Sequence, residues 1–338
     1  MQIKKDGLLT ALEMVKPGLA NKEIIEQTTS FAFVDGRVVT YNDEISLSHP
    51  VEGLDLTGAV QAENLYKFLA RIKRDELDVV KEDSQIIIKS GRAKAGLVIH
   101  AEIKLPLDSE ITDKSDWQEL PEGFNDAVKF ATGSCSTDMT NPILTCVHIN
   151  EAGIIEGSDN YRISHYKIDE MPVKTFLLPG SSALEVIKIK PTHVAEGTGW
   201  VHFKNEFDTI ISCRILEEDE YVNTSKVIRV KGTRLILPDT TGEVLERAMV
   251  FAKRDRALDE SVSITIENRR LVMEAEADNS WFEEKINMKY TGDPIKFGIT
   301  PHLLQSILNE TRECFIDDNA VKLKFQGEGW MYITMLRS

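Results

Sequence analysis

The chain of 338 residues is poor in cysteine and has no long apolar run. No stretch of about 18 consecutive apolar residues occurs, so we expect no membrane-spanning helix. The first residues lack the apolar core of a signal peptide. The four cysteines lie far apart and form no CxxC pair, which favours a reducing cytosol over a disulfide framework. We therefore expect a cytoplasmic protein. The cysteines are Cys135, Cys146, Cys213 and Cys314.

The sequence also lacks the motifs of common catalytic sites. Its seven histidines show neither HxxxH nor HExxH spacing, which a zinc enzyme would need. Ser48-His49 and Ser164-His165 are neighbours in the chain, whereas nucleophilic catalysis needs a serine and a histidine that the fold brings together. The glycine-spaced segment 91–96 lacks the Lys-Ser/Thr of a phosphate loop. We predict no catalytic residue, no metal and no cofactor, and expect that the chain is not an enzyme.

Acidic residues outnumber basic ones, 55 to 40, which gives a net charge of −15. Such a balance favours solubility and argues against a general nucleic-acid binder, which is usually basic. The acidic run 217–220 is most simply interpreted as a solvated loop. It could also bind a cation or hold paired carboxylates for two-metal chemistry. A metal-dependent hydrolase built on a repeat fold therefore stays open as an alternative.

Three copies of one pattern follow each other along the chain. Two kinds of amphipathic helix recur at intervals of about 116 to 120 residues, and a repeat at such a period indicates tandem modules. The first helix of each copy carries Leu8, Leu12 and Val15; Phe124, Val128 and Ala131; and Val244, Ala248 and Phe251. The second carries Leu65, Phe68 and Leu69; Leu184, Ile187 and Lys188; and Leu304, Ile307 and Leu308, with Lys188 as the one mismatch.

Alternating β-type segments separate these helices. The segments 38–43, 154–159 and 271–273 repeat in step with the helices, and turn residues such as Asp35-Gly36 end the strands. The pattern predicts an α+β protein whose antiparallel sheets carry helices on one face. The polar stretch 108–116 and the segment 230–233 mark the expected boundaries. The predicted domains are 1–113, 114–230 and 231–338.

The predicted helices are mildly basic although the chain is acidic. The helix expected over 62–74 presents Lys67, Arg71 and Arg74 on one face, with Lys73 beside them. Basic residues also lie on or next to the helices expected over 122–132, 181–190 and 242–256. Ordinary solvated helix faces would explain each case alone. A second interpretation is that the helices face a polyanion, since Lys and Arg bind phosphates without reading base sequence.

The triple repeat, the segment Gly157-Ser158-Asp159-Asn160-Tyr161-Arg162-Ile163-Ser164 and the ending Tyr332–Ser338 resemble the bacterial-type DNA polymerase sliding clamp, the beta subunit family. The likeness runs over the whole chain and is that of a divergent member, for which a viral or phage origin stays open. The resemblance implies three tandem DNA-clamp domains, each with antiparallel sheets and two helices on one face, that form half of a closed ring.

The same resemblance implies a DNA sliding clamp, a processivity factor that encircles duplex DNA and tethers the replicative polymerase. The implied partners are double-stranded DNA without sequence preference, a DNA polymerase, an ATP-dependent clamp loader and a second copy in a homodimer ring, with no membrane. The implied location is the cytoplasm of a bacterium or of a phage-infected host. A clamp relative that couples transcription to replication is a further alternative. Topological retention would tolerate the net negative charge.

Candidate site residues follow from the helix charges and from the family motifs. The predicted DNA contacts are Lys22, Lys67, Arg71, Lys73, Arg74, Lys129, Lys188, Lys190, Lys253 and Arg254, where Lys22 matches a basic loop residue of the family. The family's Thr-Asp-Gly-His-Arg-Leu stretch and apolar C-terminal tail line a pocket for short partner peptides. Here Asp159 and Arg162 match that stretch, whereas the other positions depart from it. The predicted pocket residues are Ser158, Asp159, Tyr161, Arg162, Ile163, Tyr221, Val227, Tyr332, Thr334 and Met335. We also expect that removal of 336–338 weakens partner binding and leaves the ring intact.

Overall fold

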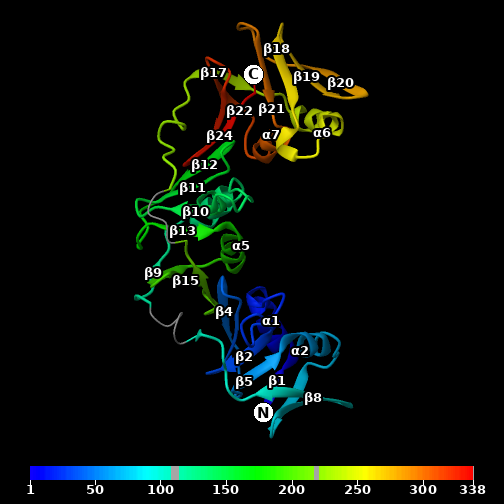
Figure 1. Ribbon diagram of the computed structural model, residues 1–338, viewed down its shortest axis with the longest axis vertical. Coiled ribbons are helices and arrows are strands. Elements are labelled where there is room, and N and C mark those ends of the chain that lie inside the picture. Colours follow the sequence, from blue (N-terminus) through cyan, green and yellow to red (C-terminus); the bar gives the residue numbers. More distant parts are fainter. Residues whose placement is uncertain (108–113, 217–220, 338) are drawn as a thin grey trace. The chain divides into compact units, whose positions relative to one another are not determined.

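The computed structural model describes residues 1–107, 114–216 and 221–337 (Figure 1). These fall into two compact units, of which the first comprises 1–125, 150–152 and 170–217 and the second the rest of the chain. The predicted boundary at residue 113 and the acidic run 217–220 lie outside the described residues. The division into three domains with the bounds given above stays a prediction.

The helices come in pairs along the chain, as the repeat predicts. They are α1 (Lys5–Val15), α2 (Ala62–Leu69), α4 (Phe124–Thr132), α5 (Gly180–Ile189), α6 (Thr241–Ala252) and α7 (Pro301–Leu308), with short 3₁₀ turns η1 (Lys16–Gly18), η2 (Pro142–Thr145) and η3 (Ala257–Asp259). The stripe of α1 that contains Leu8, Leu12 and Val15 is buried, which confirms that part of the pattern. Within the described ranges, no helix combines the length and apolar character needed to cross a membrane.

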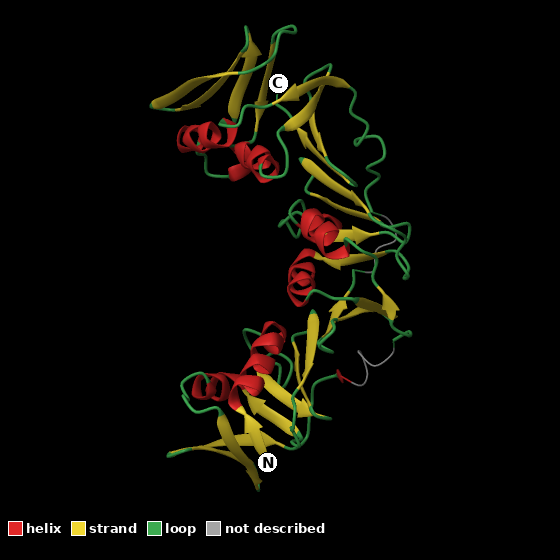
Figure 2. Ribbon diagram, turned by 180° about the vertical axis from the view of Figure 1, so that it is seen from behind, coloured by secondary structure: helices red, strands yellow, loops and turns green. Residues whose placement is uncertain are grey.

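The first unit is built on one long antiparallel sheet. Its strand order is β1-β6-β7-β8-β5-β2-β3-β4-β16-β15-β14-β9. α1 packs on β3 and β4, α2 packs on β2 and β5, and the two helices contact each other on one face of the sheet (Figure 2). The strands of the unit are β1 (Gln2–Lys4), β2 (Ser30–Val34), β3 (Arg37–Tyr41), β4 (Ile45–Pro50), β5 (Gly58–Gln61), β6 (Glu76–Glu82), β7 (Gln85–Ser90), β8 (Ala93–His100), β9 (Gln118–Glu119), β13 (Phe176–Pro179), β14 (His193–Gly197), β15 (Trp200–Lys204) and β16 (Ile210–Arg214).

The second unit contains two antiparallel sheets. One runs in the order β10-β11-β12-β24-β23-β22-β17 and the other in the order β20-β19-β18-β21. α6 packs on β18, β19 and β20, α7 packs on β24, and α6 contacts α7 (Figure 2). The strands are β10 (Cys146–Ile149), β11 (Ile154–Ser158), β12 (Arg162–Lys167), β17 (Gly232–Ile236), β18 (Val262–Glu267), β19 (Arg270–Ala277), β20 (Ser280–Asn287), β21 (Ile295–Ile299), β22 (Glu313–Asp317), β23 (Lys322–Gln326) and β24 (Trp330–Met335). The α+β class is confirmed.

Several helices end earlier than the sequence pattern predicts. α2 ends at Leu69, and the backbone N–H groups of Arg71 and Ile72 then make short i→i−3 hydrogen bonds that close the last turn. The chain must leave the helix there because β6 begins at Glu76 and pairs with β1. α6 ends at Ala252, since the next residue is extended, with ψ 134. The prediction of basic side chains on one continuous face over 62–74 is therefore wrong.

The apolar phase of α5 also differs from the prediction. Leu184 is 48 % exposed, whereas Ala183 and Val186 are fully buried. Leu65, Ala183 and Leu304 are each the fourth residue of their helix, and all three are buried. The residue of α5 that corresponds to Leu65 and Leu304 is therefore Ala183, one residue before Leu184. This shift by one residue explains why Lys188 did not fit the pattern.

Candidate functional site

The basic residues expected on the second helix are exposed but only partly helical. Lys67 lies on α2 and pairs with Glu63 one turn earlier, which holds the pKa of the Glu63 carboxyl below its ordinary value. Arg71, Lys73 and Arg74 follow the end of the helix and are also exposed. The structure thus brings these side chains together at the C-terminal end of α2, on a helix end and a turn.

A cavity of about 470 Å³ adjoins the same helix. It lies between the end of α1 and the start of α2, and both Lys16 and Lys67 line it. The Lys16 ammonium lies 4.4 Å from the centre of the Tyr66 ring, at a distance typical of a cation–π contact. The Tyr66 hydroxyl donates a hydrogen bond to Glu13 (3.1 Å). Lys16 was not among the predicted DNA contacts, although the sequence places it at the end of the first predicted helix, whose charges sum to zero.

The other predicted DNA contacts are all exposed, in different settings. Lys129 lies on α4, and Lys188 on α5 pairs with Glu185 (2.7 Å). Lys190 caps α5 in a left-handed conformation, with φ 52. Lys22 lies in the loop after η1.

Lys253 and Arg254 lie beyond α6, contrary to the prediction that places them on a helix face. The Arg254 guanidinium donates to the backbone carbonyl of Glu276 (2.7 Å) and to that of Lys253 (2.9 Å). This residue is held against β19 by its own chain, because the helix ends before it. Its availability to an outside anion is correspondingly lower than that of Lys129.

The predicted peptide pocket corresponds to a cavity of about 290 Å³ within the second unit. Its walls come from the β11–β12 turn, from the segment 222–227 and from the end of β24. Tyr161 and Val222 are large apolar residues that stay 44 % and 40 % exposed at its rim. The lining residues are Ser158, Asn160, Tyr161, Arg162, Ile163, Val222, Asn223, Thr224, Val227, Ile333 and Met335. An apolar lining with a few polar groups suits a short apolar peptide.

The turn before β12 is held by one carboxylate. Asp159 accepts hydrogen bonds from the backbone N–H groups of Tyr161 and Arg162 (both 3.0 Å) and from Arg162 Nε (2.9 Å). Asn160 adopts φ 73, a left-handed conformation that asparagine tolerates. Burial, and then the Arg162 charge, hold the pKa of His302 on α7 below its ordinary value. Asp159 does not line the cavity but positions Arg162, which does.

The C-terminal strand contributes alternate residues to the cavity. Ile333 and Met335 line it, whereas Tyr332 and Thr334, which the sequence analysis placed there, do not. Side chains of a strand alternate between the two faces, so the two sets cannot share one side. The Tyr332 hydroxyl instead donates to the Leu303 carbonyl (2.8 Å) on α7. The alternation with Met335 was the signal that would have identified Ile333.

The last described residues are part of the structure of the second unit. The Leu336 N–H donates to the Val321 carbonyl (2.7 Å), and the Leu336 side chain belongs to the hydrophobic core. Arg337 exchanges backbone hydrogen bonds with Gly298 in β21. Removal of 336–338 would therefore disturb the core of the second unit, whereas the expectation that it weakens partner binding and leaves the ring intact stays a prediction.

The wall formed by the segment 222–227 is held in place by a buried carboxylate, Glu156. Tyr221 does not line the cavity; its ring stacks on His148, with ring centres 4.6 Å apart. Thr224 is the buried residue of this segment, and its hydroxyl donates to Glu156 (2.7 Å). Val227 lines the cavity as expected, together with Val222 and Asn223, which the sequence analysis missed.

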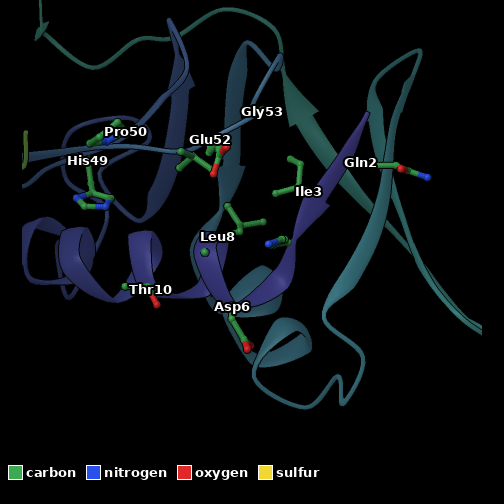
Figure 3. Close-up of a pocket in the computed structure, with 12 residues that line it drawn as sticks. Gln2, Ile3, Asp6, Leu8, Thr10, His49, Pro50, Glu52 and Gly53 are labelled. Atoms are coloured by element: carbon green, nitrogen blue, oxygen red, sulfur yellow. The ribbon is translucent and has the colours of Figure 1, made fainter. Parts of the chain in front are cut away.

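A larger cavity, of about 660 Å³, lies in the first unit between the β1–α1 junction and the end of β4 (Figure 3). Ile3 and Leu8 are among the residues that line it, and both are buried. Asp6, His49 and Glu52 also contribute to its walls. Within the described ranges, no group of three or more His, Cys, Asp or Glu side chains is placed to hold a metal ion.

The similarity of the chain to known proteins lies in its structure. No family model and no curated protein sequence matches it. Among solved structures, it is similar to the DNA polymerase III subunit beta of Pseudomonas aeruginosa, with 15 % identity and a TM-score of 0.86 over 100 % of both chains. The DNA polymerase sliding clamp of Bacillus subtilis shows 17 % identity and a TM-score of 0.84, over 100 % of this chain and 98 % of that one.

The DNA polymerase III beta chain of Streptococcus pneumoniae shows 18 % identity and a TM-score of 0.84, over 100 % of this chain and 99 % of that one. These three similarities extend over the full length of the chain, and the identity is low in each case. They agree with the order of paired helices and antiparallel sheets described above. The chain therefore has the fold of the bacterial DNA polymerase sliding clamps.

Proposed function

We propose that this protein is a DNA sliding clamp, a non-enzymatic processivity factor that encircles duplex DNA and tethers the replicative polymerase. The observation that carries the proposal is the similarity of the whole chain, from end to end, to sliding clamps from several bacteria. Exposed basic residues on and after the helices of an otherwise acidic chain add support. Contacts of this kind bind phosphates without reading sequence and weaken as the salt concentration rises.

The retention on DNA is proposed to be topological. A ring needs only weak contacts to stay on the duplex, so a net charge of −15 is compatible with it. Acidic outer surfaces would also repel DNA that is not threaded through the ring. We also propose that the protein acts in the cytoplasm of a bacterium or of a phage-infected host.

We further propose that two copies join head to tail. Such a contact uses two different surfaces and closes only when the rotation allows it. In the first unit, residues 93–98 of β8 pair with β7, and among described residues no strand covers their other edge. In the second unit, β20 is the edge strand of its sheet and exposes Trp281 by 73 %. Pairing of β8 with β20 of a second copy would cover both open edges, which otherwise invite aggregation.

The partner-peptide pocket is proposed to receive short apolar segments of the polymerase and of an ATP-dependent clamp loader. Its partly exposed Tyr161 and Val222 provide the apolar rim, and a small pocket of this kind suits one or two large side chains. Fluorescence polarisation tests this proposal. The probes are fluorescein-labelled peptides that share two adjacent large apolar residues and differ in the residues on either side of them. Met335→Ala should weaken the tightest binder, and Phe207→Ala, at an exposed position outside the pocket, should not.

A linearisation experiment tests the clamp function itself. The protein is loaded on nicked circular DNA with the clamp loader of its replication system, and bound protein is separated by gel filtration. A restriction enzyme then opens the circle. Topological binding predicts that the protein leaves the free DNA ends, whereas protein that stays on the linear form would contradict the proposal. Circles that are mock-digested are the control and should keep their protein.

A further inference from the structure

A buried carboxylate lies behind the segment that forms one wall of the peptide pocket. Glu156 on β11 is 5 % exposed and lies between His148 on β10 and His165 on β12, its partners across the two neighbouring strands. His165 Nδ1 is 2.8 Å from Oε1, and His148 Nδ1 is 3.5 Å from Oε2. The adjacent residue, Gly157, faces α4, so Glu156 points to the opposite face of the sheet.

The segment 221–230 crosses this opposite face. Thr224 is its only buried residue, and its hydroxyl donates to Glu156 Oε1 at 2.7 Å. The Thr224 carbonyl in turn accepts the backbone N–H groups of Val227 (2.8 Å) and Ile228 (3.1 Å). Thr224 therefore ties a helical turn to the sheet, next to the stacking of Tyr221 on His148, and that turn carries Val227 into the cavity.

We propose that Glu156 is a positioning residue for the partner-peptide pocket, because it anchors the wall 222–227 through Thr224. This inference rests on the proposed peptide-binding function of the cavity. Glu156 touches no peptide itself, since it does not line the cavity. A carboxylate this deeply buried needs strong donors, and His165 and Thr224 provide them at 2.8 and 2.7 Å. The bond to Thr224 is therefore charge-assisted, stronger than one between neutral groups.

The anchor explains how an otherwise exposed segment holds one shape. Val222, Asn223, Ser225 and Lys226 are all exposed, so apolar burial contributes little to their position. Without the anchor, the segment would sample other conformations, and the peptide would have to order it on binding. The cost of that ordering lowers the affinity.

Two substitutions test the anchor. Thr224→Val removes the hydroxyl and keeps the β-branched shape, and Glu156→Gln removes the charge. In Thr224→Val, hydrogen exchange at the Val227 and Ile228 amides should become about tenfold faster or more. The affinity for the tightest-binding peptide of the labelled set should fall about tenfold. Glu156→Gln should act in the same direction, and the double variant should be no worse than the more severe single one, because the two changes remove one interaction.

The matched control is Thr265→Val on β18, a threonine in the same unit whose hydroxyl has no hydrogen-bond partner among the described residues. This variant should leave both the exchange rates of the Val227 and Ile228 amides and the peptide affinity unchanged. Exchange rates in Thr224→Val equal to wild type would overturn the anchor, and faster exchange with unchanged peptide affinity would overturn the positioning role. If wild-type protein binds no peptide of the set, the proposed function of the pocket fails. The exchange rates then decide by themselves whether Glu156 holds the segment.

Discussion

At the scale of single residues, Gly157 shows how closely the second unit is packed. A Cβ at this position would overlap the backbone carbonyl of Ala131, at the end of α4. We therefore expect Gly157→Ala to reduce the free energy of unfolding by about 1–3 kcal/mol, as overpacking does in other cores. Urea unfolding measures the change.

Gly242→Ala is the control for this substitution. Gly242 lies in the first turn of α6, and a Cβ there would have no atom within 4 Å. This variant should be neutral or more stable by up to about 1 kcal/mol, because alanine is the better helix former. Equal loss of stability in both variants would show that the close approach to Ala131 is not the cause.

The buried Glu156 carboxylate should make the free energy of unfolding depend on pH. Burial pushes the pKa of the Glu156 carboxyl upwards, but His148 and the hydrogen bonds from His165 and Thr224 hold it down, at about 2. A group whose pKa is lower in the folded state stabilises the protein above its ordinary pKa, and this contribution is lost as the pH falls towards 2. At pH 7, Glu156→Gln should therefore cost about 1–3 kcal/mol of unfolding free energy.

The difference between wild type and Glu156→Gln should shrink steadily as the pH is lowered from 5 to 3. Urea unfolding midpoints at several pH values measure it. Glu170→Gln, at an exposed position, serves as the control and should track wild type throughout. A difference that stays constant down to pH 3 would mean that the Glu156 charge does not supply the stability.

At the scale of elements, the end of α2 and the turn after it form the most concentrated group of predicted DNA contacts. Arg71 and Arg74 are exposed there. The double reversal Arg71→Glu and Arg74→Glu should weaken loading onto nicked circular DNA about tenfold without a change in the unfolding midpoint, whereas a ring that has closed should stay on the circle. Two lost phosphate contacts should also reduce the slope of log affinity against log salt by about 2.

Lys89→Glu with Lys94→Glu is the matched control for this pair. The two lysines are cross-strand neighbours on β7 and β8, on the face of the sheet that points away from the core, and both are exposed. The change in net charge is the same as for the arginine pair. If loading onto DNA falls equally in both double variants, the effect comes from net charge and not from the end of α2.

At the scale of the whole molecule, the proposed ring requires two copies. Light scattering should give a mass near twice 38.1 kDa for wild type. Trp281→Asp should give the monomer mass with unchanged circular dichroism, because a large aromatic residue on an edge strand is a typical anchor of an interface. Phe207→Asp is the control: this residue is 72 % exposed but lies in the turn between β15 and β16, away from the proposed contact. A monomeric wild type at micromolar concentration would refute the head-to-tail dimer.

The family resemblance indicated much of the lining of the cavity beside Tyr161. The sequence by itself determined the α+β class and the succession of paired helices. Periodicity suffices for this, since apolar residues such as Leu12 and Val128 recur at helical spacing and are buried. Only the tertiary structure decided where α2 ends, which residue of α5 faces the core, and which face of β24 meets the cavity. Each depends on what packs against the element. The link between Glu156 and Thr224 joins positions 68 residues apart, and a contact at that separation exists only after the chain has folded.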